Sequence, residues 1–268
     1  AHPYQNPVMV WPSDFENWSQ DDLEQFFRTY YAPNNVTMVF AGDVTPEEIY
    51  LLADDYFSSI PRQHPPQPVT IVEPEQQGER RFDIEAETPT PLMHLAFHAG
   101  ATADPETLHL DLLLAIIAEG DASRLHRILV EEEGLALSVG GWQSDGFDPG
   151  LANFSLTLPP GSDIAAVEAR VFEELERVAR EGVSPAELEK ARNLRLAGFW
   201  RMLQTIRGKA QALGNFAVFT GDHENLFAVP EELSNTTEEQ LQAVAASVFR
   251  RENMTVGVLR SPAEEVAE

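Results

Sequence analysis

The sequence predicts an α+β fold in which helices pack on a mostly antiparallel sheet, built as two homologous domains of which the first is incomplete. After residue 80 the hydrophobic pattern predicts strands, helices, a hairpin, further helices and a last strand, without the alternation of a doubly wound parallel sheet. In addition, residues 19–42 (SQDDLEQFFRTYYAPNNVTMVFAG) align without a gap on residues 237–260 (TEEQLQAVAASVFRRENMTVGVLR). Both copies predict a capped helix, a turn at Asn and a strand.

The repeat also predicts how the chain is divided. Its second copy is preceded by well over ten times as much chain as its first copy, which begins at Ser19. We therefore expect a duplicated domain of about 200 residues to be cut short at the front, so that residues 1–62 are the C-terminal part of a first domain. Residues 63–79 are then a linker, residues 80–262 a second domain and residues 263–268 a tail. A chance match between two helix–turn–strand units is the alternative explanation.

Proline and N-capping residues delimit the elements expected before residue 80. Prolines before residue 18 predict a loop, and Ser19 caps a helix that runs to about residue 30. A strand is predicted over residues 36–41, and Thr45-Pro46 begins a second helix that ends near residue 60. The prolines between residues 61 and 78 occur without hydrophobic periodicity, which is typical of a linker. Four aromatic residues at helical spacing are predicted to pack in a core: Phe26, Phe27, Tyr30 and Tyr31.

The second domain shows stronger periodicity, with an almost wholly apolar segment (TLHLDLLLAIIA) that predicts a buried helix. Capping residues and glycines give the other boundaries. The predicted elements are strands at 80–87 and 92–97, helices at 107–118 and 121–133, hairpin strands at 135–142 and 151–158, a helix at 164–180, a long helix with a break from Ser184 to about 219, and the helix and strand of the second repeat copy.

Composition restricts the classes of partner and of site. Acidic residues number 44 against 18 basic ones, for a net charge of −26. Such a charge repels phosphate backbones and anionic lipids, so we expect no nucleic-acid partner, and we interpret the acidity as solubility rather than recognition of a basic partner. The chain has no cysteine, which excludes disulfides, Cys–zinc sites and thiol nucleophiles. No apolar run reaches the roughly 18 residues needed to cross a bilayer, so we expect no membrane insertion.

The histidines show no metal-binding pattern. His94 and His98 share one face of a predicted strand, but no carboxylate lies between them, which favours ordinary sheet histidines over a metal site. The motifs H-E-x-x-H and H-x-x-E-H are both absent, as are G-x-S-x-G and the phosphate-binding glycine loops. The remaining histidines lie singly in predicted helices or loops: His2, His64, His109, His126 and His223. We therefore assign no catalytic residue and no metal ligand to this chain.

Three segments resemble the pitrilysin/insulinase-like (inverzincin) zinc metallopeptidases: HPYQNPVMVW, SQDDLEQFFRTYYAPNNVTMVFAGDVTPEEI and DASRLHRILVEEEGLALSVG. The resemblance covers nearly the whole chain in order, and the YAPNN…GDV block is its most specific part. It implies two homologous α+β domains, as in mitochondrial processing peptidase. It also implies a zinc ion held by H-x-x-E-H and a later Glu, all before the HPY segment. Zinc is thus expected in the full-length parent and not in this chain.

One departure from the family pattern concerns substrate binding. The resemblance implies an Arg and, seven residues later, a Tyr that help to bind the peptide backbone or the tetrahedral intermediate. Here those positions hold Val130 and Leu137, whose side chains cannot donate a hydrogen bond. We therefore assign no substrate-binding residue, and a partner subunit is expected to supply the Arg and the Tyr.

The resemblance implies the C-terminal, non-zinc-binding portion of a zinc metalloendopeptidase that hydrolyses peptides in a clamshell chamber. This part would be scaffold and chamber wall, and inactive alone. The expected partners are the upstream part of the same polypeptide, a homo- or heterodimeric peptidase partner and a peptide substrate. The alternative is a fragment of a catalytically inactive structural or partner subunit of the same family. An unrelated small-molecule-binding α+β protein is a third reading. The sequence does not indicate the cellular compartment. The resemblance to the family favours the bacterial periplasm over the cytoplasm.

Overall fold

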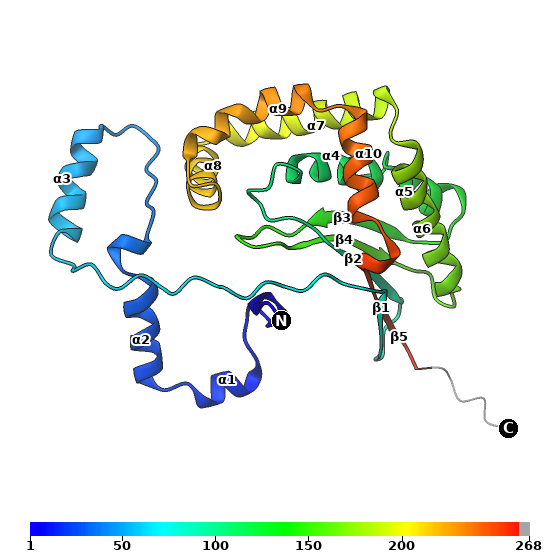
Figure 1. The fold of residues 1–268 in the computed structure, drawn as a ribbon, viewed down its shortest axis with the longest axis horizontal. Helices are drawn as coiled ribbons and strands as arrows, with labels where there is room; N and C mark the ends of the chain where they lie inside the picture. The colour runs from blue at the N-terminus through cyan, green and yellow to red at the C-terminus, as the bar shows by residue number, and fades with distance from the viewer. Residues whose placement is uncertain (263–268) are drawn as a thin grey trace.

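The computed structural model describes residues 1–262 and contains a five-stranded sheet with helices packed on one face (Figure 1). The predicted tail at 263–268 lies outside the described residues. Across the sheet the order is β1-β5-β2-β4-β3, and only the β1–β5 pair is parallel. The strands are β1 (Arg80–Glu85), β2 (Leu92–His98), β3 (Ser138–Gln143), β4 (Leu151–Thr157) and β5 (Met254–Arg260). The predicted α+β class with a mostly antiparallel sheet is confirmed.

The core lies between the sheet and the helices because alternate strand residues are apolar. Met93, Leu95 and Phe97 of β2 are fully buried, and Phe154 of β4 meets Phe97 edge to face with ring centroids 6.1 Å apart. Phe249 closes this aromatic group at 5.3 Å from Phe97. All the buried hydrophobic residues that form the core cluster lie between Met93 and Val258. The core therefore belongs to one unit of the chain.

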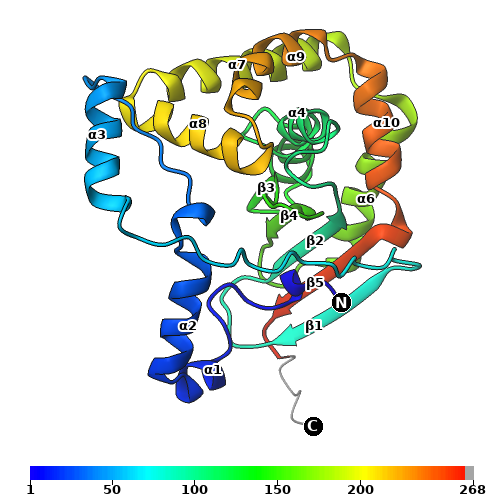
Figure 2. The ribbon, with the colours of Figure 1, turned by 60° about the vertical axis from the view of Figure 1, so that its left-hand side comes forward.

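Seven helices accompany the sheet in this unit. Helices α4, α6 and α10 supply the side chains that cover the sheet, while α7, α8 and α9 form an outer layer (Figures 1 and 2). The break predicted in the long helix falls at Gln204 and Thr205, and α9 was not predicted. The bounds are α4 (Thr107–Ile117), α5 (Arg124–His126), α6 (Ile164–Glu181), α7 (Pro185–Leu203), α8 (Ile206–Phe219), α9 (Val229–Asn235) and α10 (Glu238–Val248), with 3₁₀ turns η4 (His223–Ala228) and η5 (Arg251–Asn253).

The helix predicted over residues 121–133 is present over residues 124–132. It begins as the short α-helix α5 and continues as a π-helix, η3 (Arg127–Glu132). Its end is marked by a long-step hydrogen bond from Glu133 N to Ile128 O at 3.0 Å. Leu129 O then accepts from both Leu135 N (2.7 Å) and Ala136 N (3.0 Å), which reverses the chain at Gly134. The wider turn keeps Leu125, Ile128 and Leu129 buried.

The two copies of the repeat share their local structure up to the strand. Helix α2 (Gln20–Tyr30) and the 3₁₀ turn η2 (Pro33–Asn35) have the same bounds as α10 and η5 at the offset of the alignment. Both helices begin with a capping box, formed by Ser19 with Asp22 and by Thr237 with Gln240. The strand predicted over residues 36–41 is wrong, because this segment is extended but pairs with no other strand among residues 1–262. Its counterpart β5 has neighbours on both sides.

The first 62 residues form helices without a core. Besides α2 they contain α1 (Pro12–Asn17), where a loop was predicted, α3 (Pro46–Phe57) and the 3₁₀ turn η1 (Pro3–Gln5). Among them only His2 and Ala32 are buried. The prediction that the aromatic residues of α2 pack in a core is contradicted, since Phe27 is 61% exposed and Tyr31 is 60% exposed, as are about half of Phe26 and Tyr30. The rest of residues 1–262 leaves this face of α2 uncovered.

Residues 63–79 contain no helix or strand and run across the molecule to β1 (Figure 2). Along residues 1–262, every helix is too short or too polar to cross a membrane.

Candidate functional site

The residues predicted to be ordinary histidines lie apart from any metal-binding arrangement. In residues 1–262, no group of three or more His, Asp or Glu side chains is placed to hold a metal ion. His94 bonds through Nε2 to Asn153 Oδ1 at 3.0 Å, and its ring meets Trp142 edge to face at 5.6 Å. His109 on α4 is half-buried, and desolvation lowers its pKa despite the opposing charge of Glu106. The donor set described here does not fit a zinc site.

Val130 and Leu137 are held by the π-helix and the turn that follows it. Val130 lies on η3 and packs against the core, and Leu137 is 53% exposed at the start of β3. The backbone of Leu137 is fixed by its N–H, which donates to Thr157 O at 2.8 Å. The side chains at both positions present only carbon atoms. The segment can shape a surface but cannot donate a side-chain hydrogen bond to a peptide.

Arg124 anchors this segment to the helical layer. Its Nε donates to Glu187 Oε1 at 2.6 Å and its Nη1 to Glu174 Oε1 at 3.2 Å, which ties α5 to α7 and α6. Glu174 is 1% exposed and also accepts from Arg177 Nε at 2.9 Å. The bond from Arg124, helped by the Ser184 cap and opposed by desolvation, lowers the pKa of Glu187 to about 2. The sequence did not single out Arg124, because its partners are distant in the chain.

A second ion pair joins α4 to α7. Arg195 contacts Asp111 Oδ2 at 2.6 Å and Glu119 Oε2 at 2.6 Å. Burial raises the pKa of Asp111, and the charge of Arg195 opposes that shift. Because both acids share one arginine, this cluster is a structural clamp rather than an acid–base pair.

The face of the sheet opposite the core carries few charged side chains, and the linker covers part of it, where Gln76 lies against Thr255. The register places Phe82, Gly257, His94, Ser155 and Gly140 in one row across all five strands. A Cβ at Gly257 would lie 2.5 Å from Phe82 Cζ, so the Phe82 ring lies over this glycine. Helices α4, α6 and α10 lie on the other side of the sheet (Figure 1). At the β1 edge of this face Phe82 is 51% exposed.

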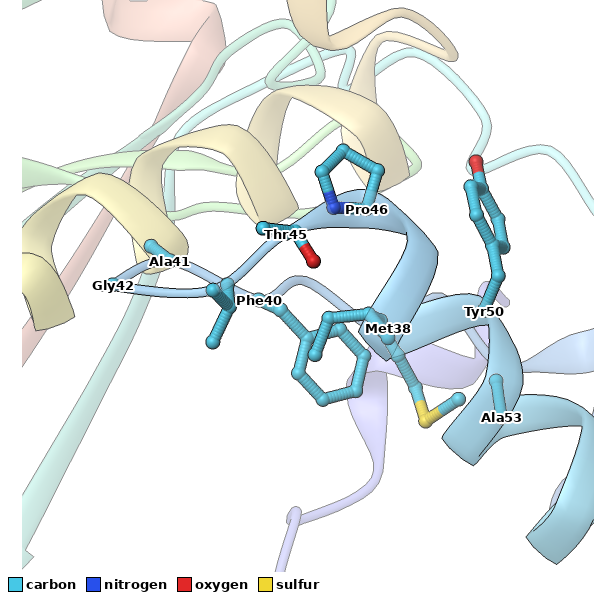
Figure 3. A pocket seen from close by; sticks show the side chains of 10 residues that line it. Met38, Phe40, Ala41, Gly42, Thr45, Pro46, Tyr50 and Ala53 are labelled. Carbon is cyan, nitrogen blue, oxygen red and sulfur yellow. The ribbon is translucent and has the colours of Figure 1, made fainter.

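An apolar hollow lies between the extended residues 38–44 and helix α3 (Figure 3). Phe40 and Tyr50 line it and are 53% and 75% exposed, and its lining includes no charged side chain. An open hollow without convergent polar groups lacks what a catalytic pocket needs. It is better explained as a surface that normally packs against further apolar side chains.

Comparison with known proteins identifies the family. A family model described as "Peptidase M16 inactive domain" matches residues 17–195, more than half of the chain. The chain belongs to this family. The predicted resemblance to pitrilysin/insulinase-like metallopeptidases is thereby confirmed, as is the prediction of a non-catalytic portion of such a protease.

Three relatives show how far the M16 likeness extends. The chain is 23% identical over 263 residues to "Zinc protease PqqE" of Helicobacter pylori, covering 97% of this chain and 59% of that protein. A crystal structure of a protease from Helicobacter pylori has a TM-score of 0.86 at 23% identity, over 94% of this chain and 62% of that one. The inactive peptidase domain of a putative zinc protease from Bordetella parapertussis has a TM-score of 0.60 at 29% identity, over 69% of this chain and 97% of that one. The chain thus spans 59% of the length of the first relative.

Proposed function

We propose that this chain is the non-zinc-binding C-terminal portion of a zinc metalloendopeptidase subunit, in which it forms scaffold and one wall of a peptide-holding chamber. Residues 1–62 would close a first domain, residues 63–79 would be a linker and residues 80–262 a second, non-catalytic domain. The observation that carries the proposal is the contrast in burial. The second unit has a closed core, whereas residues 1–62 bury only His2 and Ala32 while presenting apolar faces on α2 and α3.

The repeat supports the proposed domain division. In the second unit β5 pairs with β1 and β2, which come far earlier in the same unit. At the offset of the repeat, the counterparts of β1 and β2 that would flank residues 36–41 fall before residue 1. The size of the Bordetella parapertussis domain is a second support, since it corresponds to about two thirds of this chain, as residues 80–262 do.

Zinc belongs to the proposed full-length parent. The first relative is named a zinc protease, and the donors described in residues 1–262 do not form a zinc site. When bound, the ion would polarise a peptide carbonyl and activate water. The contribution of this chain is to hold the sheet face opposite the core and the segment from Val130 to Leu137 in place. A dimeric partner would then supply the hydrogen-bond donors that these two positions lack.

A catalytically inactive structural or partner subunit of the M16 family is the second candidate. The observation that favours it is the absence of a donor at Val130 and Leu137. The coding sequence upstream of Ala1 separates the two candidates. H-x-x-E-H with a later Glu there supports the peptidase, and degenerate residues support the structural subunit.

The purified 268-residue chain tests the non-catalytic assignment. After dialysis against zinc, metal analysis should find no stoichiometric zinc, and a library of quenched fluorescent peptides should not be cleaved. Stoichiometric zinc together with cleavage that a chelator abolishes would refute the proposal.

A further inference from the structure

Tyr4 joins the start of the chain to the loop between β3 and β4. Its hydroxyl oxygen accepts hydrogen bonds from Phe147 N at 3.1 Å and Asp148 N at 3.4 Å. Gly146 makes room for it, because a Cβ at that position would lie 2.8 Å from the Tyr4 hydroxyl and 3.2 Å from Asp148 O. Within residues 1–262, these are the hydrogen bonds that join residues 1–62 to residues 80–262.

His2 reinforces the same contact from a buried position. It is 7% exposed, and its Nδ1 accepts from Tyr4 N at 3.2 Å. Its Nε2 lies 3.2 Å from Asp148 Oδ2. The two rings meet edge to face with centroids 4.5 Å apart. The backbone N–H of His2 donates to Glu73 Oε2 at 2.9 Å, which holds this part of the linker beside His2.

The loop that receives Tyr4 is braced from behind. Gly146 N donates to Thr102 Oγ1 at 2.8 Å, and Thr102 N donates to Gly146 O at 3.0 Å. Phe147 packs on Phe219 at the end of α8, with centroids 5.0 Å apart. The receiving loop is thus built by the second unit itself. It does not need Tyr4 in order to form.

The linker is fastened next to this contact. Gln76 is 6% exposed, and its Nε2 donates to Met254 O at the start of β5 at 2.8 Å. The stretch from Tyr4 to Gln76 therefore begins and ends on neighbouring parts of the second unit, the β3–β4 loop and the start of β5. Helices α1, α2 and α3 lie on this stretch, away from the sheet (Figure 1).

We propose that His2, Tyr4 and Glu73, together with the loop Gly146–Asp148, form an anchoring contact, called the pivot below. It holds residues 1–62 on the second unit and restricts how far they can rotate relative to it. The surface recognises a Tyr hydroxyl through two backbone amides, and the partner it fits is the His-Pro-Tyr segment of this same chain. The pivot does not depend on peptidase activity, so its test is separate from that of the proposed function.

Distance measurement between spin labels tests the pivot, and the absence of cysteine makes labelling unambiguous. Labels would be attached at Gln25→Cys on α2 and Glu176→Cys on α6, both exposed positions. Tyr4→Ala should broaden the distance distribution at least about twofold relative to the labelled parent. The control Tyr50→Ala removes a tyrosine that is 75% exposed and should leave the distribution unchanged. Equal distributions for Tyr4→Ala and the parent would overturn the proposal.

Amide hydrogen exchange is a second test, because it detects loss of the Tyr4 hydrogen bonds even if residues 1–62 do not move. Tyr4→Phe removes only the hydroxyl, so exchange at Phe147 and Asp148 should accelerate about tenfold, in line with one net hydrogen bond. Gly146→Ala, which crowds the ring, should give the same acceleration at Asp148 and the same broadening between labels. Unchanged exchange in Tyr4→Phe would contradict the contact itself. Circular dichroism of each variant checks that the second unit stays folded.

Discussion

Substituting Arg124 tests whether the anchor of α5 is energetically important. The fall in the pKa of Glu187 from 4.5 to about 2 corresponds to about 3 kcal/mol in favour of the charged carboxylate. The Ser184 cap supplies part of this and solvent screens the rest, so we assign about 1–2 kcal/mol to Arg124. Its bond to buried Glu174 adds about 1 kcal/mol, because Arg177 remains as a partner there. Arg124→Met should therefore lower the free energy of unfolding by about 2–3 kcal/mol.

Urea unfolding followed by circular dichroism at pH 7 and at pH 3 measures this loss. The folded-state pKa of Glu187 is depressed, so its stabilisation is full above pH 4.5 and is lost as the pH falls toward 2. The part of the difference between Arg124→Met and the parent that passes through Glu187 should therefore shrink to about half or less at pH 3. Arg180→Met, which removes an exposed pair with Glu181, should cost less than about 0.5 kcal/mol. A cost for Arg124→Met no larger than this control, or one that does not change between the two pH values, would refute the reasoning.

Three further predictions concern burial. Deleting residues 1–62 should change the free energy of unfolding of the remaining unit by less than about 1 kcal/mol in urea titration, because no member of the core cluster is lost; a larger loss would argue against the domain division. In the same urea titration, Phe154→Ala should lower the free energy of unfolding by about 3–5 kcal/mol, because Phe154 is buried. Phe27→Ala, at an exposed site, should lower it by less than about 0.5 kcal/mol, and equal losses would contradict the burial pattern. Gly257→Ala should destabilise by about 1 kcal/mol through displacement of the Phe82 ring, and the cost should fall in a Phe82→Ala background; a cost independent of Phe82 would disprove the contact.

Much of the second unit could be predicted from the sequence because its signals are local. Alternating apolar residues locate β2 and β4, and Ser184 with Glu187 locates the start of α7. The π-helix η3 could not be predicted, because its wide turn depends on how Leu125, Ile128 and Leu129 reach the core. Helix α9 was missed because it is only seven residues long and follows directly on a 3₁₀ turn.

The residues of the candidate site were less accessible to sequence reasoning. The segment HPYQNPVMVW matches a family pattern, but nothing in it indicates that Tyr4 contacts amides more than a hundred residues away. Arg124 is similar, since Glu174 and Glu187 join it only after α6 and α7 have packed. Gly146 is a partial exception. A glycine in an Asp-rich hairpin loop predicts a tight turn, but not that the turn leaves room for a side chain.

The repeat shows why helices and strands differ in what a sequence alone can predict. Helices α2 and α10 have equivalent bounds although α10 packs in the core and α2 is exposed, because a capped helix satisfies its own backbone hydrogen bonds. The strands that follow do not behave alike. Residues 254–260 form β5 between β1 and β2, whereas the equivalent residues after η2 are extended and unpaired within the part of the chain described. A strand needs the hydrogen-bonding groups of a neighbour, so its sequence pattern is a condition that only a partner can complete. The same argument explains the exposed aromatic face of α2, which has the spacing of a core helix and lacks the sheet that such a helix covers.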